Sequence, residues 1–313
     1  MTIAITLLLF AIGLALIIKG GDAFVEAASR LAAATGIPKF IIGATIVSVA
    51  TTLPEITVSL LATVHGEREI AIGNAVGSVC CNIGLILGLA LLLRPPKVHK
   101  QELRSKGLLM AGATAFLWAF TLNGHLSLLE SLVLLGIFGY FLFSSVQQSK
   151  DHREEREKIS RRQGLWEICV FVLGATAIVL GAHLLVQNGV ILAGLLGISD
   201  EVIGLTMIAV GTSLPELITA LTAIRKNESS LSVGNIFGAN IIDITLILAA
   251  CTGASGGGLE MAAATAWVDL PVCLGLMGVV LLPAWRKGKM KRWQGGTLLA
   301  LYGIYVVCLV VTR

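Results

Sequence analysis

Charged side chains are scarce in this sequence. Only 13% of its 313 residues are Asp, Glu, Lys or Arg, whereas 56% are hydrophobic, and the mean hydropathy is +0.88. A globular domain usually carries about 25% charged residues on and near its water-facing surface. The scarcity of charge therefore excludes a soluble globular fold and favours a chain embedded in a lipid bilayer.

Cysteine and histidine are also few, and they form no metal-binding pattern. The six cysteines and five histidines include no CxxC pair or Cys/His cluster, which argues against a zinc site or a redox motif. The net charge of +4 comes from basic residues between apolar runs, where membrane proteins carry them, so we expect no nucleic acid partner. The paired aspartates or histidine motif of an intramembrane protease are missing as well. We expect that the protein is not an enzyme and that it has no cofactor and no obligatory protein partner. Its expected surroundings are a lipid bilayer.

Long apolar runs fill almost the whole sequence. Each approaches the roughly 20 residues that a helix needs to cross a bilayer, and short polar or glycine-containing turns separate them. We predict an all-α polytopic membrane protein with about ten transmembrane helices. The predicted spans are residues 2–20, 40–64, 70–93, 107–123, 127–146, 165–190, 201–224, 230–251, 262–284 and 295–312.

Two segments of the sequence are copies of each other. The segment GATIVSVATTLPEITVSLLA, which begins at Gly43, aligns without a gap with GLTMIAVGTSLPELITALTA, which begins at Gly204. Chance similarity between apolar helices does not preserve proline, glutamate and asparagine in register. The sequence therefore predicts an internal duplication, with a first five-helix repeat at residues 1–146, a charged linker at 147–163 and a second five-helix repeat at 164–313.

The number of spans in each repeat determines how the second repeat is inserted. Because five is odd, the second repeat enters the membrane from the opposite side, and the repeats are inverted. Lys and Arg concentrate in cytoplasmic loops, and an outside N-terminus places all of them there except Arg68 and Arg313. We predict a multi-pass protein of the cell membrane with both termini outside and the linker 147–163 in the cytoplasm.

Three carboxylates lie inside the predicted spans: Glu55, Glu216 and Asp243. Placing an ionisable side chain at the bilayer centre costs at least about 2.5 kcal/mol, so each of these acids should have a role that offsets this cost. The two glutamates follow prolines, which interrupt helical hydrogen bonding and free backbone carbonyls. One interpretation is that the glutamates are protonated and serve only in packing. Two Pro-Glu pairs in register with a duplication favour an ion site built on interrupted helices.

Helical spacing gathers further oxygen atoms beside these acids, because residues three, four and seven apart share a face. The four stripes are Ser48, Thr51, Thr52 and Glu55; Ala209, Thr212, Ser213 and Glu216; Asn74, Ser78 and Asn82; and Asn235, Ala239 and Asp243. The neighbouring Gly73, Gly77, Gly234 and Gly238 should allow close helix approach. Hard oxygen ligands suit Na⁺ and Ca²⁺, and Ca²⁺ takes about six to eight of them. An internal two-fold relation favours an antiporter over a passive channel.

The two copies resemble the α-repeats of the sodium/calcium exchanger family within the Ca²⁺/cation antiporters. The resemblance covers both repeats and implies exchange of Ca²⁺ for Na⁺ by alternating access, in which the first and sixth spans slide past the ion-binding core. Proton-coupled Ca²⁺ transport is the alternative, since the same glutamates could release Ca²⁺ when protonated. The implied side-chain ligands are Thr51, Thr52, Glu55, Ser78, Asn82, Thr212, Ser213, Glu216 and Asp243, joined by the main-chain carbonyls of Ser48 and Ala209.

The sequence departs from the family pattern beside two of these positions. Ala239 lacks the hydroxyl that the family usually carries opposite Ser78. Val79 and Cys80-Cys81 replace the usual asparagine-containing sequence after Gly77-Ser78, so the side-chain amide is present only in the second repeat, at Asn240. We therefore expect the two halves of the site to be chemically unequal.

Overall fold

The computed structural model describes residues 3–96, 98, 100–151, 156, 157, 159–195, 211–287 and 289–312. Helices make up most of this part of the chain. In the first half the elements are α1 (Ile3–Thr35), α2 (Lys39–Ile42), η1 (Gly43–Val47), α3 (Ser48–Thr51), α4 (Leu53–Val64), α5 (Arg68–Cys81), η2 (Asn82–Leu87), α6 (Gly88–Leu93), α7 (Lys100–Thr121), β1 (His125–Ser127) and α8 (Leu128–Asp151).

The described part of the second half is also mostly helical. Its elements are α9 (Arg161–Leu195), α11 (Leu214–Arg225), α12 (Ser229–Ile242), η3 (Asp243–Ile247), α13 (Leu248–Ala254), β2 (Gly258–Glu260), η4 (Thr265–Asp269), α14 (Leu270–Lys287) and α15 (Arg292–Thr312). The elements marked η are π-helical turns inside longer helices. Strands β1 and β2 pair antiparallel in a short ribbon, which the sequence did not indicate.

Several helices are long and apolar enough to cross a bilayer. Six of the described helices meet this condition, and the segments Lys39–Thr51 and Leu53–Val64, bent by 44°, together form a seventh candidate. Part of the seventh predicted span, residues 201–210, lies outside the described residues. An all-α membrane protein is confirmed, whereas the number of ten spans stays a prediction.

Helix α1 is longer than the sequence suggested. It continues past residue 20 to Thr35, so Asp22 and Glu26 lie on the helix and not in a loop. Its 33 residues extend about 50 Å, which exceeds the roughly 30 Å hydrocarbon core. The end beyond the apolar part is held by ion pairs, because Arg225 contacts Asp22 and Lys226 contacts Glu26. Two ion pairs at the surface thus connect α1 to the C-terminal end of α11.

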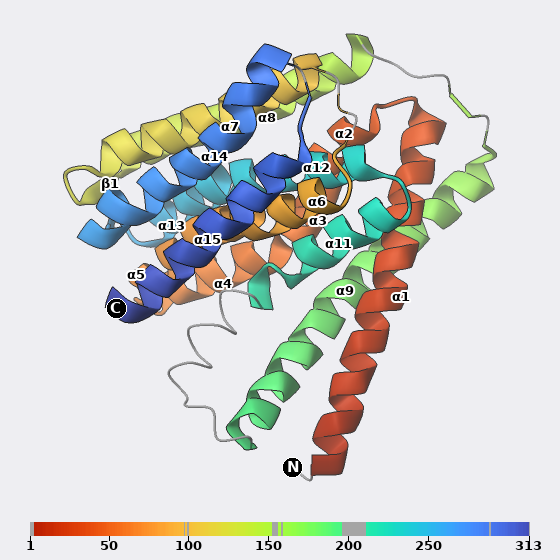
Figure 1. The fold of residues 1–313 in the computed structure, drawn as a ribbon, viewed down its shortest axis with the longest axis horizontal. Coiled ribbons are helices and arrows are strands. Elements are labelled where there is room, and N and C mark those ends of the chain that lie inside the picture. The colour runs from red at the N-terminus through yellow and green to blue at the C-terminus, as the bar shows by residue number, and fades with distance from the viewer. Residues whose placement is uncertain are drawn as a thin grey trace.

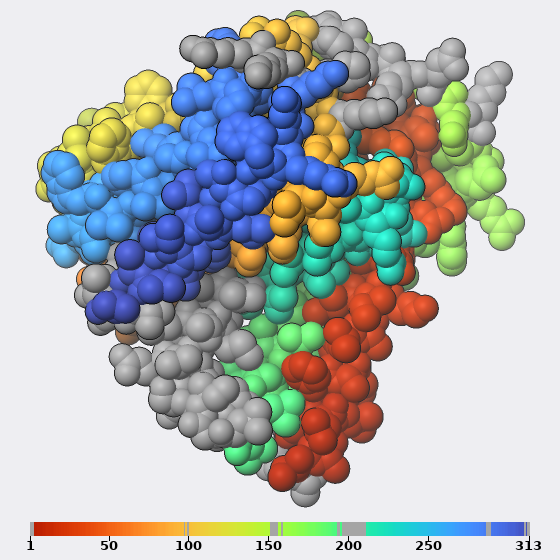
Figure 2. Space-filling model, in the orientation of Figure 1, coloured from red at the N-terminus to blue at the C-terminus, as the bar shows by residue number. Residues whose placement is uncertain are grey.

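Helices α1 and α9 form a pair that extends beyond the other helices (Figures 1 and 2). Glycines allow their backbones to approach closely: an added Cβ at Gly13 would meet the backbone at Gly181, and one at Gly20 would meet Ala177 and the backbone at Gly174. Small residues at such crossings are typical of helix packing in membranes. The pair corresponds to the first and sixth predicted spans.

Helix α12 lies at the centre of the rest of the molecule. Its residues from Leu231 to Ile242 are all buried, and it crosses the first half at η1. An added Cβ at Gly234 or Gly238 would overlap the backbone of this first-half helix, which confirms the prediction for these two glycines. Among the described atoms, a Cβ at Gly73 or Gly77 would meet nothing within 4 Å. The corresponding partner segment of the second half, residues 201–210, lies outside the described residues, so close approach at these two glycines stays a prediction.

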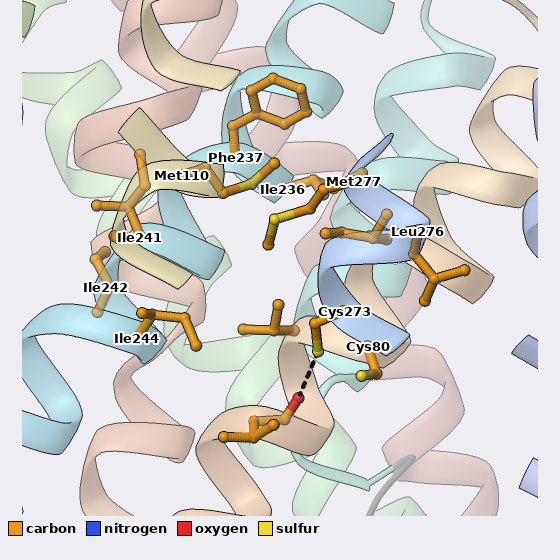
Figure 3. Packing of buried hydrophobic residues seen from close by; sticks show 14 of the residues in the cluster. Cys80, Met110, Ile236, Phe237, Ile241, Ile242, Ile244, Cys273, Leu276 and Met277 are labelled. Atoms are coloured by element: carbon orange, nitrogen blue, oxygen red, sulfur yellow. Dashed lines mark hydrogen bonds between the residues drawn. The ribbon is translucent and has the colours of Figure 1, made fainter. Parts of the chain in front are cut away.

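An apolar layer covers the other side of α12. Figure 3 shows Met110 of α7 and Met277 of α14 packed near Ile236 and Phe237 of α12. Unbranched methionine side chains fill irregular gaps of this kind. The layer thus packs against the part of α12 that carries Ile236 and Phe237.

Candidate cation site

Two helices break at corresponding positions of the two halves. Thr52 has φ −84° and ψ 0° just before α4, and Ser213 has φ −84° and ψ 6° just before α11. Pro54 and Pro215 follow within the first turn, where proline is tolerated because its missing N–H would have no helical partner. The breaks place Glu55 and Glu216 in the first turn of a new helix.

Two π-helical turns begin at the polar residues of the following helices. Segment η2 begins at Asn82 and segment η3 begins at Asp243. Such turns occur often at functional sites because they leave the regular hydrogen-bond pattern of the helix and redirect side chains. The local geometry thus changes at the same position in both halves, although the side chain is an amide in one and a carboxylate in the other.

The predicted site residues are buried together with these breaks. Nine of them have low exposure: Ser48 0%, Thr51 2%, Thr52 0%, Glu55 1%, Ser78 3%, Asn82 1%, Ser213 2%, Glu216 1% and Asp243 0%. Thr212 is half-buried, and Ala209 lies outside the described residues. Because buried polar groups are normally paired, the hydrogen-bond partners of these side chains show which of their atoms are left over.

Hydrogen bonds join the two halves at this place. The Thr52 hydroxyl donates to Glu216 Oε1 over 3.3 Å, and the Ser213 hydroxyl contacts the Ser78 hydroxyl at 3.4 Å. Partners in each pair come from opposite halves of the chain, so residues about 150 positions apart converge on one centre. The contacts also bring the two broken helices, α3–α4 and α11, face to face.

In the part of the chain that the structure describes, six oxygen atoms in this group have no hydrogen-bond partner. They are both carboxylate oxygens of Glu55, both of Asp243, Oε2 of Glu216 and the amide oxygen of Asn82. Coulomb interaction couples Glu55 to both other acids and Asp243 to Glu216, so the three carboxyl groups lie within electrostatic range of one another. Buried oxygens of one sign without donors are what a cation requires, and their number falls in the range that Ca²⁺ prefers.

Two observations define the limits of this arrangement. Among the described residues, no three His, Cys, Asp or Glu side chains form a ready metal cluster, so the carboxylates need the neutral hydroxyl and amide oxygens to complete a coordination shell. The Ser48 carbonyl already accepts hydrogen bonds from the Thr52 backbone N–H at 2.9 Å and from the Thr51 hydroxyl at 3.3 Å. A cation at that carbonyl has to share it with these donors.

Three asparagines outside the predicted ligand set contact it. Asn235 accepts a hydrogen bond from Thr51 at 3.1 Å, and Asn74 donates to the Glu55 carbonyl at 3.2 Å. Asn240 accepts a hydrogen bond from Asn82 at 3.0 Å. The sequence showed that Asn74 and Asn235 each begin a stripe with four-residue spacing. It did not show that these two side chains contact α3 and α4.

An apolar cavity of about 540 Å³ reaches the broken helices from the side of α9. Pro54, Pro215 and the half-buried Thr212 line one wall, and His183 of α9 lines another. The cavity is lined by Pro54 and Pro215, the residues that precede Glu55 and Glu216 at the two helix breaks.

Comparison with known proteins identifies a family. The model of the family described as "Sodium/calcium exchanger protein" matches residues 5–147 and 166–311. The chain is 36% identical to the inner membrane protein YrbG of Escherichia coli, covering 93% of this chain and 92% of the relative. It is 33% identical to the sodium/calcium exchanger MaX1 of Methanosarcina acetivorans, covering 98% of this chain and 99% of the relative.

Solved structures agree with the sequence comparison. A structure of the sodium-calcium exchanger NCX_Mj, soaked with zero Na⁺ and Ca²⁺, superposes with a TM-score of 0.87 at 33% identity and covers 98% of this chain and 100% of its own. A second structure of the same exchanger, soaked with 10 mM Na⁺ and 10 mM Sr²⁺, gives a TM-score of 0.86 at 34% identity. The similarity therefore extends over the whole architecture.

Proposed function

Because the chain belongs to the sodium/calcium exchanger protein family and is a membrane-embedded cation antiporter, we propose that it exchanges Ca²⁺ for Na⁺ by alternating access. The observation that carries the proposal is the set of six buried carboxylate and amide oxygens without hydrogen-bond partners. Such a set is costly to keep unless a cation occupies it during part of the cycle. Ca²⁺ and Na⁺ are the substrates here, and no resident cofactor is involved.

The proposed ligands come from both halves of the chain. The two glutamates hold the divalent ion, and Asp243 with the Asn82 amide oxygen completes the charged and polar centre. The neutral oxygens, which suit Na⁺, are those of Ser48, Thr51, Thr52, Ser78, Ala209, Thr212 and Ser213. Hydroxyl ligands beside the glutamates favour sodium coupling, because a proton-coupled site has less need of neutral oxygens.

The proposed architecture is ten spans in two inverted repeats, at residues 1–146 and 164–313, joined by a cytoplasmic linker at 147–163. Both termini are outside. The similar backbone angles at Thr52 and Ser213 support the repeat relation, as do the π-helical turns that begin at Asn82 and Asp243. The long pair of α1 and α9 fits two helices that move together against the remaining bundle, since among the described residues its main contact with that bundle is made to α11.

Purified protein in proteoliposomes tests the function. Ca²⁺ uptake should follow an imposed Na⁺ gradient and should stay at background under a pH gradient alone. Uptake driven equally well by a pH gradient would replace sodium coupling with proton coupling. Uptake that needs no counter-gradient would indicate a channel and would contradict the proposal of exchange.

A matched pair of variants tests the site. Glu216→Gln removes the negative charge of a buried proposed ligand, whereas Glu69→Gln makes the same change at an exposed glutamate. Sodium-driven uptake should fall to background in the first variant and should keep the wild-type rate in the second. Equal rates in both variants would exclude Glu216 from the ion site.

A further inference from the structure

The Asn82 side chain can serve a cation in only one of its two orientations. An amide has an oxygen that accepts and an NH₂ group that only donates, so the NH₂ group has to face away from a bound cation. In the structure, Asn82 Nδ2 donates to Asn240 Oδ1 over 3.0 Å, and the Asn82 oxygen has no hydrogen-bond partner. The contact with Asn240 thus selects the orientation that leaves the oxygen available.

Asn240 is itself held in one orientation. Its Nδ2 contacts the Met110 Sδ at 3.5 Å, and a thioether sulfur can accept but cannot donate. If the Asn240 amide turned over, its NH₂ group would face the NH₂ group of Asn82 and its oxygen would face the sulfur. Both residues are almost fully buried, Asn82 at 1% and Asn240 at 0%, so water cannot repair such a mismatch. The series of contacts Met110–Asn240–Asn82 therefore has one favourable arrangement, in which Asn82 donates to Asn240 and Asn240 donates to Met110.

The two repeats differ at both positions of this pair. The residue that corresponds to Asn82 in the second repeat is Asp243, and the residue that corresponds to Asn240 in the first repeat is Val79. A carboxylate presents an oxygen whichever way it turns, so Asp243 needs no neighbour to orient it. The orienting amide is present only opposite the ligand that needs orientation. The first repeat thus has no amide at position 79, and the residue at position 243 is a carboxylate that does not need one.

We propose that Asn240 is a positioning residue that turns the Asn82 amide oxygen toward the transported cation, with Met110 supporting Asn240 from α7. Figure 3 shows Met110 in the apolar layer beside Phe237, where its sulfur can approach α12. This inference rests on the proposed function, because it requires Asn82 to be a ligand. Asn240 itself does not contact the cation and acts through the direction of another side chain.

A double-mutant cycle with Ca²⁺ as the probe tests this role. The dissociation constant for Ca²⁺ is measured by calorimetry on purified protein, so the test does not depend on turnover. Asn240→Leu removes the acceptor at similar volume and should weaken Ca²⁺ binding roughly 5- to 100-fold, the range expected for one lost orientation-setting hydrogen bond in a buried site. In the Asn82→Asp background, where either oxygen can face the ion, the same substitution should change the dissociation constant less than about 2-fold.

Two outcomes overturn the role of Asn240, and they can be told apart from a failure of the site. A loss of the same factor in both backgrounds would show that Asn240 acts only on packing, and an unchanged constant for Asn240→Leu alone would show that it does not orient Asn82. Unchanged binding in Asn82→Leu would instead remove Asn82 from the ligand set and would contradict the proposed site as well. Met110→Leu, which keeps the volume and removes the acceptor, should weaken binding in the same direction by a smaller factor.

Discussion

Replacing Gly234 by alanine should separate the two halves of the molecule at their closest crossing. An added Cβ there would overlap the carbonyl of Phe40 and approach the amide nitrogen of Ala44 within 3.0 Å. These are backbone atoms, so no flexible side chain can move aside. Alanine gains about 0.5 to 1 kcal/mol over glycine inside a helix, whereas overpacking costs about 1 to 3 kcal/mol. We expect a net loss of stability of about 1 to 2 kcal/mol.

The same change should reach the ion site. Asn235, the next residue of α12, holds the Thr51 hydroxyl through a 3.1 Å hydrogen bond. A displacement of about 0.5 Å would lengthen this bond beyond the range in which it contributes. Thr51 would then lose its fixed orientation, so sodium-driven Ca²⁺ uptake should fall several-fold in addition to the loss of thermal stability.

Thermal unfolding in detergent and uptake in proteoliposomes measure the two effects. The control is Gly139→Ala on α8, where an added Cβ meets nothing within 4 Å, and this variant should be as stable as the wild type or slightly more stable. If Gly234→Ala unfolds at the wild-type temperature or above and transports normally, then the crossing is not as tight as the structure shows.

Three further predictions concern charge. Glu55→Gln should abolish exchange while the protein still inserts, and wild-type uptake would remove it from the site. Asp243→Asn should retain measurable Ca²⁺ uptake with an altered Na⁺ dependence, because it reproduces the residue of the first repeat; complete loss at every pH tested would show that an ionised Asp243 is required. A cysteine introduced by Arg156→Cys, in a background without native cysteines, should react with a membrane-impermeant reagent only from the cytoplasmic side, and labelling from outside would reverse the proposed orientation.

The sequence indicated where the candidate site residues lie along the chain, but not how they meet in space. Glu55, Glu216 and Asp243 could be recognised because acids are rare within apolar runs, and the prolines before the glutamates indicated where helices break. The breaks at Thr52 and Ser213 confirm this interpretation. The sequence predicted a first span at residues 2–20 but not that the helix continues to Thr35, because the end of an apolar run does not show where a helix ends. It also did not show that Asp22 and Glu26 pair with Arg225 and Lys226.

The sequence by itself determined the membrane-embedded class, the duplication and the supply of hard oxygen ligands, because composition and register are properties of the linear chain. Only the tertiary structure decided which of these atoms meet. Thr52 and Glu216 are 164 positions apart, and Asn82 and Asn240 are 158 positions apart, so no helical spacing relates them. Their contacts exist because the broken helices of the two halves converge, and burial then leaves the remaining oxygens without a hydrogen-bond partner among the described residues.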